Sequence, residues 1–181
     1  EFAERNGLEW TDGQTLTAAI GQSYDLFTPL QLANYIATLV GGGQHYEAHL
    51  LKNVKSYDNS SVIYAYDKAP LNTVEMSGST VQAVKEGMHN LTTGSLSYYF
   101  SNCVVSAGAK TGTAETGIAN TNNGVFVCFA PYDDPQIAVA VVIEKGGSGA
   151  ALASTAVDIV NSYFSQEEIG AVVIGENILL K

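Results

Sequence analysis

The stretch Lys110–Glu115 reads Lys-Thr-Gly-Thr-Ala-Glu and lies in the most strand-like part of the chain, residues 103–144. Turn-forming residues interrupt this part twice, at the Gly/Asn-rich segment 117–124 and at Pro131–Pro135. Both connections are short, which is typical of consecutive antiparallel strands. The last strand is almost continuously apolar, which indicates burial on both faces. The sequence therefore predicts three antiparallel strands, at residues 109–115, 124–130 and 137–144.

Three helices are expected around these strands. In Thr28-Pro29-Leu30-Gln31, Thr28 can cap a helix and Gln31 can complete a capping box, while proline suits the first turn. Glycines 41–43 end this helix, and further helices are expected at residues 79–91 and 150–164. Their inner faces are marked by apolar residues at helical spacing: Leu32, Ala33, Ile36, Leu39 and Val40; Val81, Val84, Met88 and Leu91; Leu152, Ala156, Ile159, Val160 and Tyr163.

The remaining segments give weaker patterns. Residues 50–66 flank a polar turn at Asp58-Asn59 and predict a β-hairpin. Residues 1–20 indicate an irregular lead-in, and residues 166–181 form a tail. Together the elements predict an α+β fold, in which an antiparallel sheet is flanked by helices.

Composition excludes several classes of function. The net charge is −10 and no run of Lys and Arg stands out, so no nucleic-acid partner is expected. Hydrophobic residues make up 46% of the 181 residues, enough for a packed core. No stretch approaches the roughly 18 apolar residues of a membrane-spanning helix.

Cys103 and Cys128 lie in apolar surroundings, which favours two buried thiols over a disulfide.

Strand geometry gives the segment Lys110–Thr113 a defined chemistry. Alternation puts Lys110 and Gly112 on one side of the strand, and Thr111 and Thr113 on the other. On an edge strand both pairs can border a cleft. Lys110 then offers a positive charge to a nucleophile or carboxylate, and Gly112 leaves room for a substrate backbone to add as a strand. The two threonines offer hydroxyls, and the Thr113 amide can donate to an oxyanion.

The order of these elements resembles the active-site serine penicillin-recognising enzymes, and it is most similar to the class B penicillin-binding proteins. Their three motifs are Ser-x-x-Lys, Ser-x-Asn and Lys-Thr-Gly, and Lys110–Glu115 matches the third. Gly21-Gln22 with Thr28–Ala33 is similar to the helix after the second motif, and Phe129-Ala130-Pro131 to the hairpin that follows the third. The resemblance covers about residues 20–165.

The first two motifs are missing from this chain. No serine is followed by a lysine three residues later or by an asparagine two residues later, and Ser106 precedes Lys110 by four. In the family both motifs lie before the helix that begins after Thr28. The resemblance thus implies that residues 1–165 are the C-terminal portion of a transpeptidase domain, followed by a tail at residues 166–181. The family's five-stranded sheet would be incomplete, because three strands are present here.

The resemblance implies a serine-type peptidoglycan D,D-transpeptidase as the parent protein, anchored by an N-terminal segment to the outer face of the bacterial cytoplasmic membrane. Its serine would attack the D-Ala-D-Ala unit of a stem peptide, and β-lactams would trap the acyl-enzyme. Lys110 and Thr113 would be catalytic, and Lys110, Thr111, Gly112 and Thr113 would bind the substrate or drug. The resemblance implies no cofactor and no metal. Without the serine, this chain alone is expected to be inactive.

Alternatives within the same fold stay open. A serine β-lactamase or carboxypeptidase would share the motif, and a non-catalytic penicillin-sensing or cell-division binding module would lack the serine. The strand at residues 137–144 would lose its family neighbour, so we expect its edge to be covered by another copy, by another fragment such as the N-terminal part of the domain, or by the tail.

Two other patterns have ordinary explanations. His45 and His49 are four residues apart, as in a zinc-binding pair on a helix. Three glycines precede them and a strand-like segment follows, which argues against a helix and favours ordinary surface histidines. Gly146–Gly149 precedes a helix, where a tight turn is favoured over an anion site.

Overall fold

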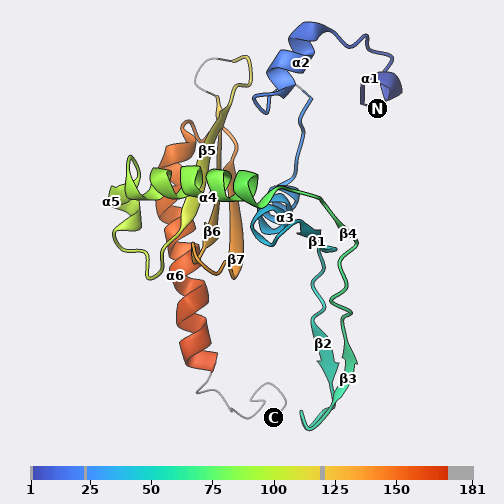
Figure 1. The fold of residues 1–181 in the computed structure, drawn as a ribbon, viewed down its shortest axis with the longest axis vertical. Coiled ribbons are helices and arrows are strands. Elements are labelled where there is room, and N and C mark those ends of the chain that lie inside the picture. Colours follow the sequence, from blue (N-terminus) through green and yellow to red (C-terminus); the bar gives the residue numbers. More distant parts are fainter. Residues whose placement is uncertain (1, 23, 119–120, 171–181) are drawn as a thin grey trace.

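The computed structural model describes residues 2–22, 24–118 and 121–170. Figure 1 shows its elements in chain order: α1 (Phe2–Arg5), α2 (Asp12–Ala18), α3 (Pro29–Val40), β1 (Gln44–His45), β2 (Asn53–Lys55), β3 (Val62–Ala65), β4 (Asn72–Thr73), α4 (Gly78–Thr93), α5 (Ser97–Phe100), β5 (Gly108–Ala114), β6 (Asn123–Ala130), β7 (Ile137–Ile143), the 3-10 helix η1 (Gly149–Leu152) and α6 (Ala153–Gly170). The three expected strands, the three main helices and the hairpin are all present.

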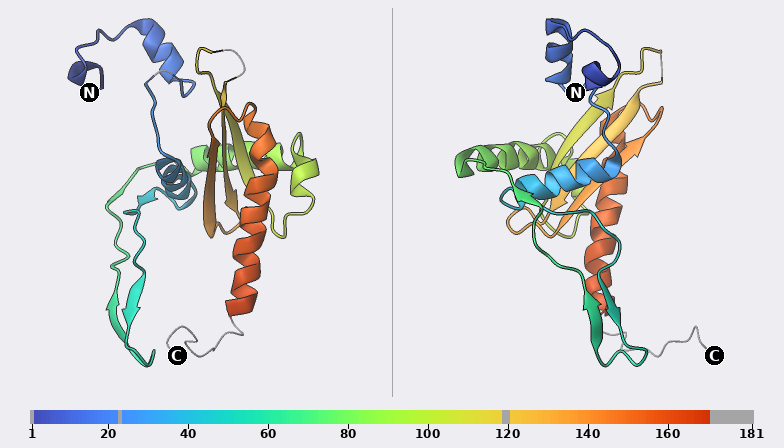
Figure 2. Two further views of the ribbon diagram at one scale, coloured as in Figure 1. Left: turned by 180° about the vertical axis from the view of Figure 1, so that it is seen from behind. Right: turned by 90° about the vertical axis from the view of Figure 1, so that its right-hand side faces the viewer.

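The central sheet has the order β5-β6-β7, and both pairs are antiparallel as predicted. Helix α6 covers one face, while α3 and α4 lie on the other; the front and back views in Figures 1 and 2 show the two layers. The register pairs Thr111 with Phe126 and Gly112 with Val125. Alternate residues of each strand therefore meet different helices, which gives the sheet two separate buried layers.

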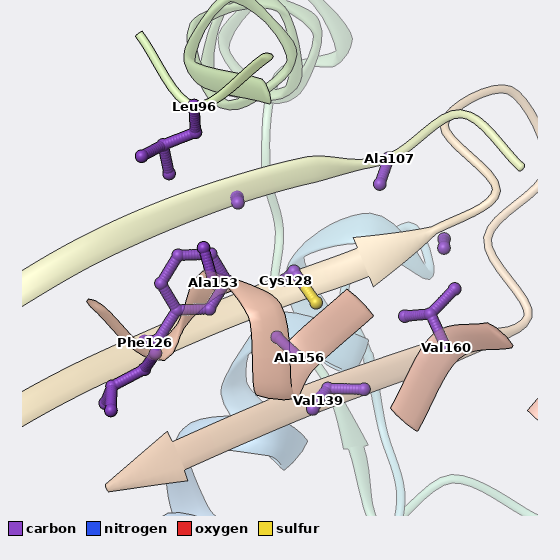
Figure 3. Packing of buried hydrophobic residues seen from close by; sticks show 11 residues of the cluster. Leu96, Ala107, Phe126, Cys128, Val139, Ala153, Ala156 and Val160 are labelled. Carbon is purple, nitrogen blue, oxygen red and sulfur yellow. The ribbon is translucent and has the colours of Figure 1, made fainter. Parts of the chain in front are cut away.

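The layer beneath α6 is built from small and aromatic residues. Phe126 and Cys128 of β6 are completely buried against Ala153, Ala156 and Val160 (Figure 3). Alanines let the helix axis approach the sheet closely, and the aromatic ring fills the remaining space. Leu152, Ala156 and Val160, which the helical spacing placed on the inner face of this helix, are all buried.

The opposite layer is smaller. Ile36 of α3 and Met88 of α4 pack with Phe129, which is completely buried. Gly108 permits this arrangement, because a Cβ there would lie 2.5 Å from the Phe129 ring. The crossing of α4 over the start of β5 therefore depends on a glycine in the strand.

The predicted start of α3 is confirmed atom by atom. The Thr28 hydroxyl accepts a hydrogen bond from Gln31 N at 3.2 Å, and Gln31 Oε1 accepts one from Thr28 N at 2.8 Å. This reciprocal pair satisfies two N–H groups that the first helical turn leaves without partners. It fixes where the helix begins relative to the sheet.

Several sequence-based expectations were wrong. Residues 1–20 are not an irregular lead-in, because they contain the helices α1 and α2. A capping box between Thr11 and Gln14 stabilises the N-terminus of α2. Val84 and Ile159 are each 40% exposed, so neither belongs to the inner face of its helix. In β7 the only buried side chain is Val139, because this strand lies at the end of the sheet order.

The hairpin β2–β3 extends away from the sheet in Figure 1, and the short pair β1–β4 connects it to the body. Helix α6 continues to Gly170, across the expected boundary at residues 165 and 166. The end of the expected tail, residues 171–181, lies outside the described residues.

Candidate active site

The Lys-Thr-Gly segment lies on an edge strand. β5 stands at one end of the order β5-β6-β7, so within the described part of the chain its outer edge has no strand partner. Lys110 and Gly112 share a face with Val127 and Val125, and Thr111 shares the other face with Phe126. The predicted alternation is thus confirmed. The outer edge is the position at which an extended peptide adds as a further strand.

Two side chains contact carbonyl groups of this strand. Lys110 Nζ donates to Thr111 O at 2.7 Å, and Gln22 Nε2 donates to Thr113 O at 3.5 Å. In an antiparallel ladder the N–H and C=O of one residue point to the same side, and alternate residues share that side. The two contacts therefore assign the backbone groups of Thr111 and Thr113 to the open edge. The charge of Lys110 lies at the same edge.

A backbone N–H at the start of η1 orients the Thr113 hydroxyl. Thr113 Oγ1 accepts a hydrogen bond from Gly149 N at 3.3 Å. A threonine hydroxyl has one proton to donate besides its two acceptor positions. Because the Gly149 bond uses an acceptor position, the O–H proton stays available for a carboxylate.

Gly149 was missed as a site residue. A Cβ at Gly149 would lie 2.1 Å from Gly112 O and 2.4 Å from Val125 O, so this residue rests directly on the backbone of β5 and β6. The glycine-rich sequence at residues 146–149 indicated a tight turn, but it gave no sign of which strand the turn touches. The turn itself is confirmed, and Gly147 has φ +73°.

The sequence marks Gln22 only by its resemblance to the family and assigns it no role. Its half-buried side chain brings the segment before α3 to the end of β5. Between this segment and the sheet lies a cavity of about 640 Å³ lined by Leu26, Phe27, Ala114, Val125 and Val142 among others. Its volume falls within the roughly 300–1,000 Å³ of small-molecule sites.

The other predicted alternatives have structural explanations. His49 stacks on Tyr66 with 3.4 Å between ring centroids, and its Nδ1 lies 2.8 Å from Leu51 O. The described residues contain no group of His, Cys, Asp and Glu that could hold a metal ion.

Cys103 and Cys128 are free thiols, of which Cys128 is buried and Cys103 half-buried. Burial raises the pKa of Cys128 to about 12.

A helix-flanked antiparallel sheet with Lys-Thr-Gly-Thr on its edge strand defines the class of serine penicillin-recognising proteins. Residues 3–163 match the family model described as the penicillin binding protein transpeptidase domain, and the chain belongs to this family. Its relatives are class B penicillin-binding proteins. The antiparallel sheet and its flanking helices correspond to the fold of that domain.

Curated relatives extend the match to the whole chain. Penicillin-binding protein 2A of Bacillus subtilis is 31% identical, with 100% of this chain and 26% of the relative covered. Peptidoglycan D,D-transpeptidase MrdA of Haemophilus influenzae is 27% identical over 88% of this chain and 27% of its own. The chain thus spans about a quarter of the length of these relatives.

Solved structures agree with this match. Penicillin-binding protein 2B of Streptococcus pneumoniae strain R6 superposes with a TM-score of 0.76 at 30% identity, covering 87% of this chain and 28% of that one. PBP2 of Pseudomonas aeruginosa, solved in complex with WCK 5153, gives a TM-score of 0.68 at 27% identity. The match covers 97% of this chain and 37% of that chain. Across the described residues, no helix is long and apolar enough to cross a membrane.

Proposed function

We propose that this chain supplies the Lys-Thr-Gly wall of a serine-type D,D-transpeptidase site that cross-links peptidoglycan stem peptides. The observation that carries the proposal is the open edge of β5, where the Lys110 charge and the backbone groups of Thr111 and Thr113 occur together. Relatives named peptidoglycan D,D-transpeptidase support the reaction class. The first two motifs, with the nucleophilic serine, lie upstream of this chain.

The reaction has two steps. The serine oxygen attacks the carbonyl carbon of the penultimate D-Ala, its proton passes to a neighbouring base, and the carbonyl oxygen becomes an oxyanion. The Thr113 N–H, on the open edge, donates to that oxygen together with the serine's own N–H. The C–N bond then breaks and D-Ala leaves. The amine of a second stem peptide attacks the ester, forms the new amide and releases the serine.

The remaining groups bind the substrate. The terminal carboxylate of D-Ala-D-Ala accepts hydrogen bonds from the hydroxyls of Thr111 and Thr113, of which the latter keeps its proton available. Lys110 adds a positive charge that favours the anionic groups of the site. Gly112 carries no side chain, so the substrate backbone can approach β5 closely. β-Lactams bind the same groups and remain as acyl-serine.

Labelling with a fluorescent penicillin tests the proposal. The full protein, with its upstream part, should be labelled once, at a serine outside residues 1–181. This chain alone should not be labelled, because it has no Ser-x-x-Lys. Stoichiometric labelling of a serine within this chain would contradict the proposal. A full protein without Ser-x-x-Lys upstream would favour the non-catalytic binding module.

The proposal extends to location and to contacts of the sheet. An upstream segment anchors the parent protein, and the domain lies on the outer face of the bacterial cytoplasmic membrane, where stem peptides are exposed. The outer edge of β7 is covered by the N-terminal part of the same domain or by a second copy. Ile143, at the end of this strand, is 44% exposed. A hollow of about 430 Å³, lined by Ile137, Ile159 and Tyr163 among others, lies at the other end of β7.

A further inference from the structure

A hollow lined by both polar and apolar side chains lies between α5 and the first half of α6. Its volume is about 290 Å³, and it is lined by Tyr98, Tyr99 and Asn102 on one side and Ser154 and Asp158 on the other. A second hollow of about 290 Å³ shares Ser101 with it, and its lining combines hydroxyl-bearing residues with Phe100, Val105 and Ala107. Together they reach the size of small-molecule sites, roughly 300–1,000 Å³. We call the pair the α5–α6 groove; none of its lining residues belongs to β5.

The walls of the α5–α6 groove are fixed by hydrogen bonds. Asn161 Oδ1 accepts from Val104 N at 2.9 Å, and Asn161 Nδ2 donates to Asn102 O at 2.9 Å. The loop after α5 is thereby tied to α6. Ser101 Oγ donates to Tyr98 O at 2.8 Å, and Leu96 before α5 is buried. Because both walls are held in place without a ligand, binding requires little ordering of the protein.

Polar groups in the α5–α6 groove have no protein partner. In the part of the chain that the structure describes, no hydrogen bond engages the side chains of Tyr98, Asn102, Ser154 or Asp158. The Tyr98 side chain is 83% exposed and meets Tyr99 edge-on, with 5.5 Å between ring centroids and 80° between planes. One face of an aromatic ring is thus presented to solvent beside a carboxylate, an amide and hydroxyls.

These groups fit a neutral ligand that carries many hydroxyls. The lining residues include Asp158 and His89 but neither Lys nor Arg, so phosphates and carboxylates are disfavoured. A peptide that adds as a strand needs an open strand edge, and the walls are largely helical. A pyranose ring has an apolar C–H face that packs on an aromatic ring and hydroxyls that donate to carboxylate and amide oxygens.

We propose that the α5–α6 groove binds a glycan chain of N-acetylated amino sugars. The choice of this sugar class rests on the proposed function, because stem peptides are carried on such glycan strands. The groove then holds the strand while the open edge of β5 receives its peptide. Tyr98 supplies the stacking surface, and Asp158 accepts hydrogen bonds from sugar hydroxyls.

Titration with the N-acetylglucosamine trimer, followed by NMR of backbone amides, tests this proposal on the full chain. Saturable shifts are expected at residues 97–102 and 154–161. Tyr98→Ala should lower the association constant about tenfold, because it removes the stacking ring, whereas Tyr98→Phe should keep most of the binding. Asp158→Asn should weaken binding. Tyr57→Ala is the matched control, since Tyr57 is 85% exposed but lies on the hairpin turn.

Two results would overturn the proposal: no saturable shifts in the α5–α6 groove, or equal binding by wild type and Tyr98→Ala. Equal binding of maltotriose would overturn the assignment to amino sugars. The outcome is separable from the proposed function, because the titration needs no serine. Penicillin labelling of the full protein can fail while the groove binds the trimer, and the reverse also holds.

Discussion

Gly149 rests on the backbone of Gly112: a Cβ at Gly149 would lie 2.1 Å from Gly112 O. The same residue donates its N–H to Thr113 Oγ1 at 3.3 Å. The start of η1 thus both supports the Lys-Thr-Gly strand and orients one of its hydroxyls. Any side chain at Gly149 separates these two segments, so stability and site geometry are coupled at this point.

Gly149→Ala should lower the free energy of unfolding by about 1–3 kcal/mol, because the added methyl group collides with backbone that cannot move alone. Urea denaturation followed by circular dichroism measures the change. Gly87→Ala is the control: Gly87 lies in α4, where a Cβ would meet nothing within 4 Å. The control should gain about 1 kcal/mol from helix propensity. Equal stability of Gly149→Ala and wild type would contradict the contact.

The sequence predicted the sheet, the main helices and the Lys-Thr-Gly strand because their patterns are local. The Thr28 capping box and the alternation of Lys110 and Thr111 depend only on neighbours in the chain. The contacts of Gln22 and Gly149 with β5 join residues 91 and 36 positions apart, and no local pattern encodes them. The exposure of Val84 shows the same limit, since helical spacing does not reveal how wide the covered stripe is.

Lys110→Ala in the full protein should slow acylation by a labelled penicillin roughly 100-fold, because it removes a charge at the site of reaction. Its free energy of unfolding should stay within about 0.5 kcal/mol of that of the wild type, since Lys110 is exposed. Lys55→Ala, on the hairpin, removes a charge of the same sign and should leave acylation unchanged. An unchanged acylation rate in Lys110→Ala would exclude a catalytic role for this residue.

The two cysteines should differ in reactivity. Burial raises the pKa of Cys103, and it raises that of Cys128 to about 12. The thiolate is the reactive form, so its fraction at pH 8 is about 10⁻⁴ for a pKa of 12. Iodoacetamide at pH 8 should therefore modify Cys103 first, and Cys128 only after unfolding in urea. Mass spectrometry of the intact chain measures this order; simultaneous modification of both thiols would contradict it.

The hairpin turn should contain an unusually acidic carboxyl group. Hydrogen bonds from Ser56 Oγ and Ser60 Oγ, at 2.6 and 2.8 Å, hold the pKa of Asp58 at about 2, below its ordinary value of 3.8. Because the folded pKa is the lower one, the contribution to stability is present above pH 3.8 and is lost as the pH falls toward 2. NMR titration of the carboxyl carbon measures the midpoint.

Ser56→Ala should move this midpoint up toward 3.8, because it removes the largest cause of the shift. Ser61→Ala is the matched control in the same turn, since the described residues show no hydrogen bond from the Ser61 side chain. A midpoint near 3.8 in the wild type would mean that the two serine hydroxyls do not bind the carboxylate in solution.

The outer edge of β7 should make the isolated chain associate. Its backbone groups have no strand partner within the described segments, and Ile143 is 44% exposed. Exposed apolar edges promote pairing with other chains, and an added charge opposes it. Sedimentation velocity should detect dimers or larger species of the wild-type chain, and Ile143→Lys should shift them toward monomer. Ile63→Lys, at a hairpin residue that is 69% exposed, adds the same charge elsewhere and should leave association unchanged. A wild-type chain that stays monomeric at all concentrations would show that this edge needs no partner.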